Sequence, residues 1–130
     1  MTLSQTAQDE VTAATIAAIE RFNVAFNNHD VPGVMAAMTD DCVFESTGPS
    51  PDGGRFEGQA AVRAVWESFF AGSSSAHFEA EDSFAAGDQC TVRWLYRWTN
   101  ADGTAGHVRG VDVFRVRDGK VAEKLAYVKG

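Results

Sequence analysis

Asp112 is the residue whose type and position point most clearly to chemistry. Residues 108–117 alternate as a strand, and one of its faces carries valines, a glycine and a phenylalanine together with this acid. Ionising a carboxyl group on an apolar face costs free energy, so either the pKa of Asp112 is raised or its side chain has a partner. Such a carboxyl suits general acid or base catalysis, and it suits a structural ion pair equally well.

Three large aromatic residues follow one another along one face of a predicted strand at residues 90–99. They are Trp94, Tyr96 and Trp98, separated by residues of the opposite face. Broad rings with a few polar atoms suit an organic ligand that is held by few directional contacts. They also suit an ordinary hydrophobic core, and the spacing by itself favours the core.

Lys124 is a further candidate, because a lysine beside Asp112 would keep the carboxyl group ionised. It lies in a predicted strand at residues 121–129 whose two faces are about equally apolar, so the pattern does not determine which face is buried. Lysine side chains in general extend toward solvent. His107 falls on the strand face opposite Asp112 and would reach the same site only through a bulge or from its rim, which favours a surface position.

The elements that must position these residues are predicted from hydrophobic periodicity and turn residues. The predicted helices cover residues 9–28, a short segment that begins at Asp30 and includes Met38, and residues 60–71; the predicted strands cover residues 42–46, 77–86, 90–99, 108–117 and 121–129. A loop rich in glycine and proline at residues 48–54 is long enough to form a rim or a lid. Three helices followed by long strands predict an α+β fold, with the helices on one face of an antiparallel sheet.

The composition narrows the possible partners. A length of 130 residues predicts one domain, residues 1–130, and a formal net charge of −7 argues against binding to nucleic acid or to an anionic membrane. Cys42 and Cys90 lie in separate apolar stretches without other ligand residues, so we expect no metal, no other cofactor and a reducing, cytoplasmic location. No run of apolar residues is as long as a membrane span requires.

The charge is unevenly distributed along the chain. Residues 1–88 hold 14 acidic and 3 basic residues, whereas residues 89–130 hold 4 acidic and 8 basic residues. An asymmetry of this kind can mark an interaction face. On the predicted sheet, the basic segment would form the outer face, away from the helices.

Four stretches carry a family resemblance: residues 29–30 before the short helix, 39–44 leading into the first strand, 56–58 before the third helix, and 110–124 near the end. In this order they resemble the NTF2-like superfamily, nearest to its SnoaL-like polyketide cyclase and ketosteroid isomerase branches. The resemblance implies a cystatin-like cone, in which a curved antiparallel sheet wraps three helices around a deep pocket, commonly as a homodimer. It therefore moves the aromatic stripe from the core toward the lining of a pocket.

The resemblance also implies roles for single residues. Asp112 falls where ketosteroid isomerases hold an oxyanion-hole aspartate and where SnoaL-like cyclases hold their acid/base aspartate. The general base of the isomerases falls at Ser46 and their oxyanion tyrosine at Phe22, and neither residue can take over that role. Met38 and Trp66 fall where some isomerases hold supporting tyrosines. Steroid isomerisation by that mechanism is therefore not expected.

We expect a small-molecule enzyme of SnoaL-like type that transfers protons without a cofactor, in isomerisation, cyclisation or related lyase chemistry, on an apolar substrate with a carbonyl group. Asp112 would be the acid or base, and Tyr96 or Trp98 would donate to the developing enolate oxygen. The alternative is a non-catalytic ligand-binding or interaction domain. A histidine–aspartate pair, as in dehydratase-like branches, would fall at His77 and Asp30, although helix capping already explains Asp30.

The remaining expectations concern the lining of the pocket and the assembly. We expect the pocket to be lined by Phe22, Phe26, Met38, Phe44, Ser46, Trp66, Trp94, Tyr96, Trp98 and Lys124. An apolar strip flanked by arginines would make a homodimer contact on the outer sheet face, through Arg93, Leu95, Arg97, Arg109, Val111, Val113 and Arg115.

Overall fold

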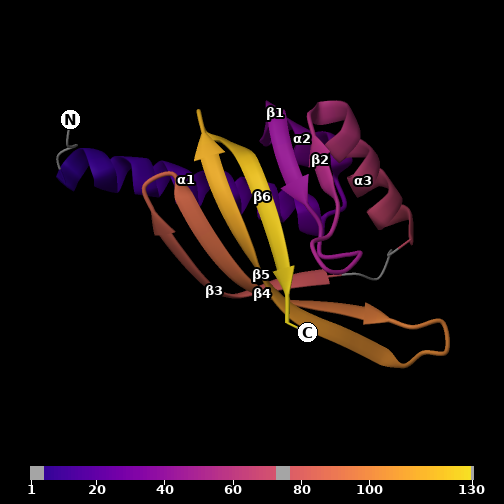
Figure 1. Ribbon diagram of the computed structural model, residues 1–130. Helices are drawn as coiled ribbons and strands as arrows, with labels where there is room; N and C mark the ends of the chain where they lie inside the picture. Colours follow the sequence, from indigo (N-terminus) through magenta and orange to yellow (C-terminus); the bar gives the residue numbers. More distant parts are fainter. Residues whose placement is uncertain (1–4, 73–76, 130) are drawn as a thin grey trace.

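A computed structural model describes residues 5–72 and 77–129, which form helices and a six-stranded sheet (Figure 1). The elements in chain order are α1 (Gln5–Asn27), α2 (Val31–Ala36), β1 (Met38–Glu45), β2 (Arg55–Glu57), α3 (Gln59–Gly72), β3 (His77–Ala86), β4 (Gln89–Thr99), β5 (Ala105–Arg117) and β6 (Lys120–Val128). The α+β class predicted from the sequence is confirmed. None of the helices in these two ranges is long and apolar enough to cross a membrane.

The long first helix, α1, supplies the centre of the core. Ile19, Phe22 and Phe26 recur at helical spacing, and the structure buries all three against the sheet. The helix already includes Gln5, four residues before the predicted start, because residues 5–8 contain a single apolar residue, Ala7, and one residue shows no periodicity. At its other end the Asn27 side chain both donates to the Phe78 carbonyl and accepts from the Phe78 amide, which ties α1 to the start of β3.

The sheet is open and mixed, with the strand order β2-β1-β6-β5-β4-β3. Strands β3 to β6 form the expected antiparallel meander, but β1 runs parallel to β6, so the expectation of a wholly antiparallel sheet is wrong at this pair. The periodicity of a strand shows which of its faces is buried, whereas the direction of its neighbour depends on contacts far away in the sequence. Register shifts in β1, β3 and β5 add bends to the sheet.

The helices cover one face of this sheet. Figure 1 shows α1 extending across the sheet, whereas α3 packs beside β1 and β2 at the other end. Between them lies a cluster of buried aromatic side chains, in which Phe26 makes ring contacts with Trp66, Phe70 and Phe78. This cluster holds α1, α3 and β3 together, so burial of aromatic surface determines the position of both helices on the sheet.

Two local predictions near the second helix need correction. Met38 was assigned to the apolar stripe of that helix, but α2 ends at Ala36 and Met38 begins β1, where its side chain is 1% exposed. Asp30 caps α2 as predicted, because its carboxylate accepts from the Gly33 amide at 3.0 Å. Strand β2 was not predicted, since three residues are too few for periodicity to reveal.

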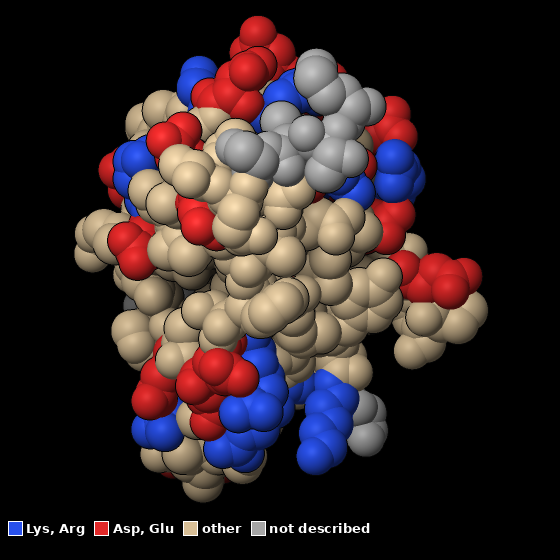
Figure 2. All heavy atoms as spheres, turned by 90° about the vertical axis from the view of Figure 1, so that its left-hand side faces the viewer, with Lys and Arg blue, Asp and Glu red and all other residues tan. Residues whose placement is uncertain are grey.

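The outer face of the sheet is less basic than the sequence suggests. Its arginines pair with acids of neighbouring strands, among them Arg97 with Glu79 at 3.4 Å and Arg109 with Glu81 at 3.1 Å. Figure 2 accordingly shows basic and acidic side chains lying together over the lower part of the molecule. Leu95 pairs with Glu79 and Arg109 in the strand register and is only 4% exposed. Leu95 was expected to belong to an open apolar strip with Val111 and Val113, and it is buried instead.

Candidate functional site

A cavity of about 240 Å³ lies between the helices and the sheet. Its walls come from α1, α3, the end of β1 and the strands β3 to β6, which brings together segments distant in the sequence. The residues that line it are Phe26, Phe44, Ser46, Thr47, Val65, Trp66, Phe69, Phe78, Trp94, Tyr96, Val108, Asp112, Lys124, Ala126 and Val128. Most of these side chains are apolar or aromatic, so the few polar groups among them will govern how a ligand is oriented.

Asp112 and Lys124 form a buried ion pair in the wall of this cavity. Lys124 Nζ lies 3.4 Å from Asp112 Oδ1, and the two side chains are 7% and 9% exposed. They come from neighbouring strands, and the register that pairs Asp112 with Ala126 sets Lys124 diagonally beside it. The face of β6 that the sequence left open is therefore settled, with Lys124 pointing inward.

Two opposing effects act on the carboxyl group of Asp112. Burial raises its pKa above the ordinary value, because the charged form loses its hydration. The positive charge of Lys124, the indole of Trp94 and the hydrogen bond from Lys124 lower the pKa, but burial has the larger effect. The alternation of β5 predicted either a raised pKa or a partner, and the structure shows both. A carboxyl group held in this way can exchange a proton with a bound molecule.

The ammonium group of Lys124 is surrounded by aromatic rings. Its Nζ lies 4.9 Å from the ring centre of Phe44, 5.4 Å from that of Trp66 and 5.5 Å from that of Phe26. The faces of aromatic rings attract cations, so the rings replace part of the hydration that the ammonium loses. A positive charge can therefore remain inside an otherwise apolar cavity.

Two indole N–H groups in the cavity lining are left without an acceptor. Within residues 5–72 and 77–129, Trp66 Nε1 and Trp94 Nε1 are buried side-chain donors with no hydrogen-bond partner. A buried donor without a partner costs about 1–3 kcal/mol, so such groups are rare and call for an explanation. Trp94 lies close enough to Asp112 to lower its pKa without completing a hydrogen bond. An acceptor atom of a ligand would satisfy either donor.

A second, smaller cavity of about 40 Å³ touches the same ion pair. Asp112 and Lys124 line it together with Phe22, Asn23 and Asn27 of α1. Its size is that of one or a few water molecules, and its asparagine side chains offer hydrogen bonds. The ion pair therefore borders both cavities, together with Phe26, Phe78 and Trp94.

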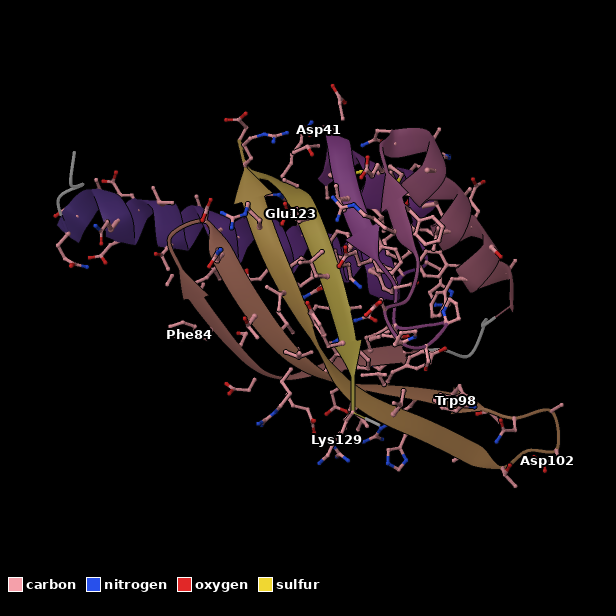
Figure 3. The ribbon with its side chains drawn as sticks, viewed as in Figure 1. Asp41, Phe84, Trp98, Asp102, Glu123 and Lys129 are labelled. Atoms are coloured by element: carbon pink, nitrogen blue, oxygen red, sulfur yellow. The ribbon has the colours of Figure 1, made fainter. Side chains whose placement is uncertain are left out.

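The predicted pocket residues fall into four groups. Those that line the large cavity are Phe26, Phe44, Ser46, Trp66, Trp94, Tyr96 and Lys124, together with Asp112. Phe22 lines the small cavity, and Met38 packs in the core. Trp98 lies on the β4–β5 hairpin that extends away from the helices (Figure 3), where its indole donates to Asn100 at 2.9 Å. The expectation that Trp98 donates into the cavity is therefore wrong.

Sequence reasoning missed several lining residues, among them Val65, Phe69 and Phe78. The spacing of the first two along α3 was visible, but helical spacing alone does not separate a pocket wall from a core contact. Ser46 reaches the cavity, although its hydroxyl is already engaged in the loop: it donates to the Gly48 carbonyl at 2.8 Å and accepts from the Gly54 amide at 2.9 Å.

His77 and His107 do not line either cavity at the ion pair. His107 is exposed on β5 and faces the outer side of the sheet together with Arg97, as the alternation predicted. His77 is exposed at the start of β3, while Asp30 caps α2, so the structure does not assemble them as a catalytic pair. In the part of the chain that the structure describes, no group of His, Cys, Asp and Glu could hold a metal ion.

An unclosed, curved sheet with helices on one face and an apolar cavity between them defines an α+β fold of the NTF2-like type. The chain belongs to the SnoaL-like domain family, which it matches over residues 19–124. Among curated proteins, no sequence matches it.

Solved structures share the fold of this chain. An NTF2-like protein of unknown function from Mesorhizobium loti is 39% identical, with a TM-score of 0.77, and the match covers 92% of this chain and 93% of that protein. Rv0760c from Mycobacterium tuberculosis, crystallised with estradiol-17β-hemisuccinate, is 24% identical over 88% of this chain and 92% of its own, with a TM-score of 0.74. TerC, co-crystallised with polyporic acid, is 20% identical over 89% and 92%, with a TM-score of 0.76.

Proposed function

We propose that the protein binds an apolar organic molecule with a carbonyl group and transfers protons on it without a cofactor. The observation that carries this proposal is the pair of unpartnered indole donors, Trp66 and Trp94, in the same apolar cavity as the buried carboxyl group of Asp112. A carbonyl oxygen is an acceptor that would satisfy such a donor. The Trp94 donor replaces the Trp98 donor that the sequence suggested, because Trp98 donates to Asn100, whereas the suggested Tyr96 does line the cavity.

The proton transfer follows from this geometry. A ligand oxygen that accepts from Trp94 brings the carbon next to its carbonyl group close to Asp112. The carboxylate takes a proton from that carbon, while the indole N–H and the charge of Lys124 stabilise the enolate oxygen that develops. Returning the proton to another carbon gives isomerisation, and attack of the enolate on a second carbonyl group gives cyclisation. Expulsion of a leaving group gives lyase chemistry.

The relatives support a ligand of this kind. Rv0760c was crystallised with estradiol-17β-hemisuccinate and TerC with polyporic acid, and both share the fold of this chain. An organic ligand is therefore compatible with the fold. The reaction itself rests on the chemistry of Asp112 and the indole donors, because fold alone does not determine function.

Hydrogen–deuterium exchange tests the proposal. We expect the protein to catalyse exchange of the hydrogens beside the carbonyl group of 2-tetralone in D₂O, followed by NMR. Asp112→Asn should slow this exchange by about 10²–10⁴-fold, because the general base is lost. Trp94→Phe should slow it by about 10²-fold or more, because one oxyanion donor is lost. Phe84→Leu is the control, since Phe84 is 72% exposed at the far end of β3 (Figure 3) and should change nothing. Equal rates for Asp112→Asn and the unmodified protein would exclude Asp112 as the base.

A non-catalytic binding domain is the second proposal. It is favoured by the ion pair itself, because a carboxylate that is already compensated by Lys124 needs no catalytic role to be retained. Native mass spectrometry separates the two proposals. A binding domain releases 2-tetralone without deuterium, whereas an enzyme in D₂O releases it labelled.

We also propose a homodimer through the outer sheet face, in a reducing cytoplasmic location. Leu95 is shielded, so the apolar contact shifts toward Val111 and Tyr127, which are paired on β5 and β6 and border a surface hollow. The two free, buried cysteines support the reducing location. Light scattering at micromolar concentration should give the mass of a dimer, and Tyr127→Glu should shift it toward the monomer. A monomeric mass for the unmodified protein would rule the dimer out.

A further inference from the structure

Lys124 differs from the other lysines because it is buried beside a cavity, and an ion pair alone does not explain that position. The sequence contains three lysines, and Lys120 and Lys129 are exposed at the two ends of β6. Lys124 is buried beside a cavity large enough for an organic molecule. Its hydrogen bond to Asp112 is long, at 3.4 Å, whereas charged pairs usually approach to about 2.8 Å. The ammonium group therefore makes only a long hydrogen bond to Asp112, and Lys124 lines the cavity.

We propose that Lys124 is a nucleophile that captures the carbonyl group of an apolar aldehyde or ketone as an imine. This inference rests on the proposed function, because it assigns a covalent step to the same cavity. The surroundings of Nζ suit both partners of the reaction. Aromatic walls hold the apolar carbonyl compound, and Asp112 stands beside the amine to accept and return a proton.

The covalent step balances with the groups present. The Lys124 ammonium gives one proton to the Asp112 carboxylate, and the neutral amine attacks the carbonyl carbon. A nitrogen–carbon bond forms, the carbonyl π electrons move to oxygen, and a proton passes from nitrogen to that oxygen to give a carbinolamine. Asp112 then returns its proton to the hydroxyl group, the nitrogen lone pair forms the second carbon–nitrogen bond, the carbon–oxygen bond breaks and water leaves. The products are a protonated imine on Lys124, one water molecule and the Asp112 carboxylate.

Both cavities contribute to this step. The small cavity borders the same two residues and has room for the water molecule that leaves. The protonated imine keeps its positive charge near the rings of Phe44, Trp66 and Phe26, which already surround the ammonium group. A protonated imine also withdraws electrons from the neighbouring carbon more strongly than a ketone does. It would therefore make the proton transfer by Asp112 easier.

Reductive trapping tests the inference on the unmodified protein. The protein is incubated with 2-naphthaldehyde at equal concentration and sodium cyanoborohydride at neutral pH, and peptide mass spectrometry then measures the modified fraction of each lysine. Although Lys124 is buried, we expect it to be modified more than about tenfold faster than Lys120 or Lys129, because the cavity holds the aldehyde beside the amine. The same peptides provide the internal control. Modification of Lys120 and Lys129 at the same rate as Lys124, or faster, would overturn the inference.

Two further arms separate cavity chemistry from general lysine reactivity. 2-Methylnaphthalene has a similar shape but no carbonyl group, so it should suppress modification of Lys124 and leave Lys129 unchanged. Asp112→Asn should slow modification of Lys124 and again leave Lys129 unchanged. If 2-methylnaphthalene suppresses neither lysine, the adduct forms outside the cavity and the inference fails.

Lys124→Arg distinguishes this inference from the proposed function. Arginine keeps a positive charge beside Asp112 but cannot form the imine. We expect Lys124→Arg to bind 2-methylnaphthalene in equilibrium dialysis, to give no adduct at residue 124 and to lose the 2-tetralone exchange. Exchange that survives at the full rate, with no adduct on the unmodified protein, would refute the imine and leave proton transfer by Asp112 intact. Loss of dialysis binding in the unmodified protein, with no adduct, would refute both.

Discussion

Replacing Lys124 with methionine should strongly destabilise the fold at neutral pH. Both side chains of the pair are less than one-tenth exposed, so the change leaves a buried carboxylate without its compensating charge. The loss of one partner of a buried pair costs about 3–5 kcal/mol, against about 0–1 kcal/mol for an exposed pair. For a chain of this length the larger loss lowers the melting temperature by roughly 10–20 °C.

The loss should depend on pH in a defined direction. Burial raises the pKa of Asp112, and without Lys124 nothing of comparable charge opposes that effect. A carboxyl group whose pKa is raised on folding contributes stability that is fully present below the unfolded value of 3.8 and is lost as the pH rises through the folded pKa. The Lys124→Met protein should therefore be more stable at pH 5 than at pH 8, relative to the unmodified protein.

A double variant completes the measurement. Lys124→Met combined with Asp112→Leu removes both charges, and it should recover most of the lost stability or exceed the original by about 1–4 kcal/mol. Urea unfolding at pH 5 and pH 8, followed by tryptophan fluorescence, gives the free energy of unfolding for each protein. A loss below about 1 kcal/mol for Lys124→Met, equal at both pH values, would refute the claim that the pair is buried and charged.

Three further variants test other parts of the structure. Asn27→Ala should lower the free energy of unfolding in urea by about 1–3 kcal/mol, because it removes the two hydrogen bonds that tie α1 to β3 and leaves a half-buried amide and carbonyl unpaired. A loss of only a few tenths of a kcal/mol would show that water replaces these hydrogen bonds. Asp41 pairs with Arg117, which lowers the pKa of the Asp41 carboxyl. The contribution of this pair to stability is therefore present above pH 3.8 and is lost as the pH falls through the folded pKa. Asp41→Asn should lower the melting temperature at pH 7 and leave it unchanged at pH 2, and equal shifts at both pH values would contradict the pairing. Gly110→Ala should cost about 1–3 kcal/mol of stability, because the new methyl group would meet a backbone carbonyl of β6 and the Trp94 ring. Gly106→Ala meets only a ring on the extended hairpin and should cost less. The reverse order would show that β6 yields more easily than the hairpin.

The fold was largely predictable because most of its signals are local. The helix stripe of Phe22 and Phe26, the turns between the later strands and the alternation around Asp112 all follow from the order of residues over short distances. The limits of β3, residues 77–86, agree with the structure for the same reason. The parallel pairing of β1 with β6 was missed because it joins segments about 80 residues apart, and no local pattern encodes the direction of a distant neighbour.

The site was predictable only in part, for a related reason. Alternation placed Asp112 on the inner face, but two equally apolar faces left Lys124 undecided, and only the register with β5 settles its orientation. The tertiary structure likewise decides which tryptophan lacks a hydrogen-bond acceptor. Trp98 finds one two residues away in Asn100, whereas Trp66 and Trp94 find none within the described ranges. The sequence could identify tryptophans as possible donors without showing which of them a ligand could use.

The place of β6 in the sheet has a consequence for folding during synthesis. It is the last strand in sequence order, yet it lies between β1 and β5. Until β6 leaves the ribosome, the β1–β2 pair has no strand through which to join the β3–β5 meander, and the sheet remains in two parts. Lys124 arrives on that same strand. The two parts of the sheet therefore join in the same event that completes the cavity, so a nascent chain cannot form a complete binding site before its fold is complete.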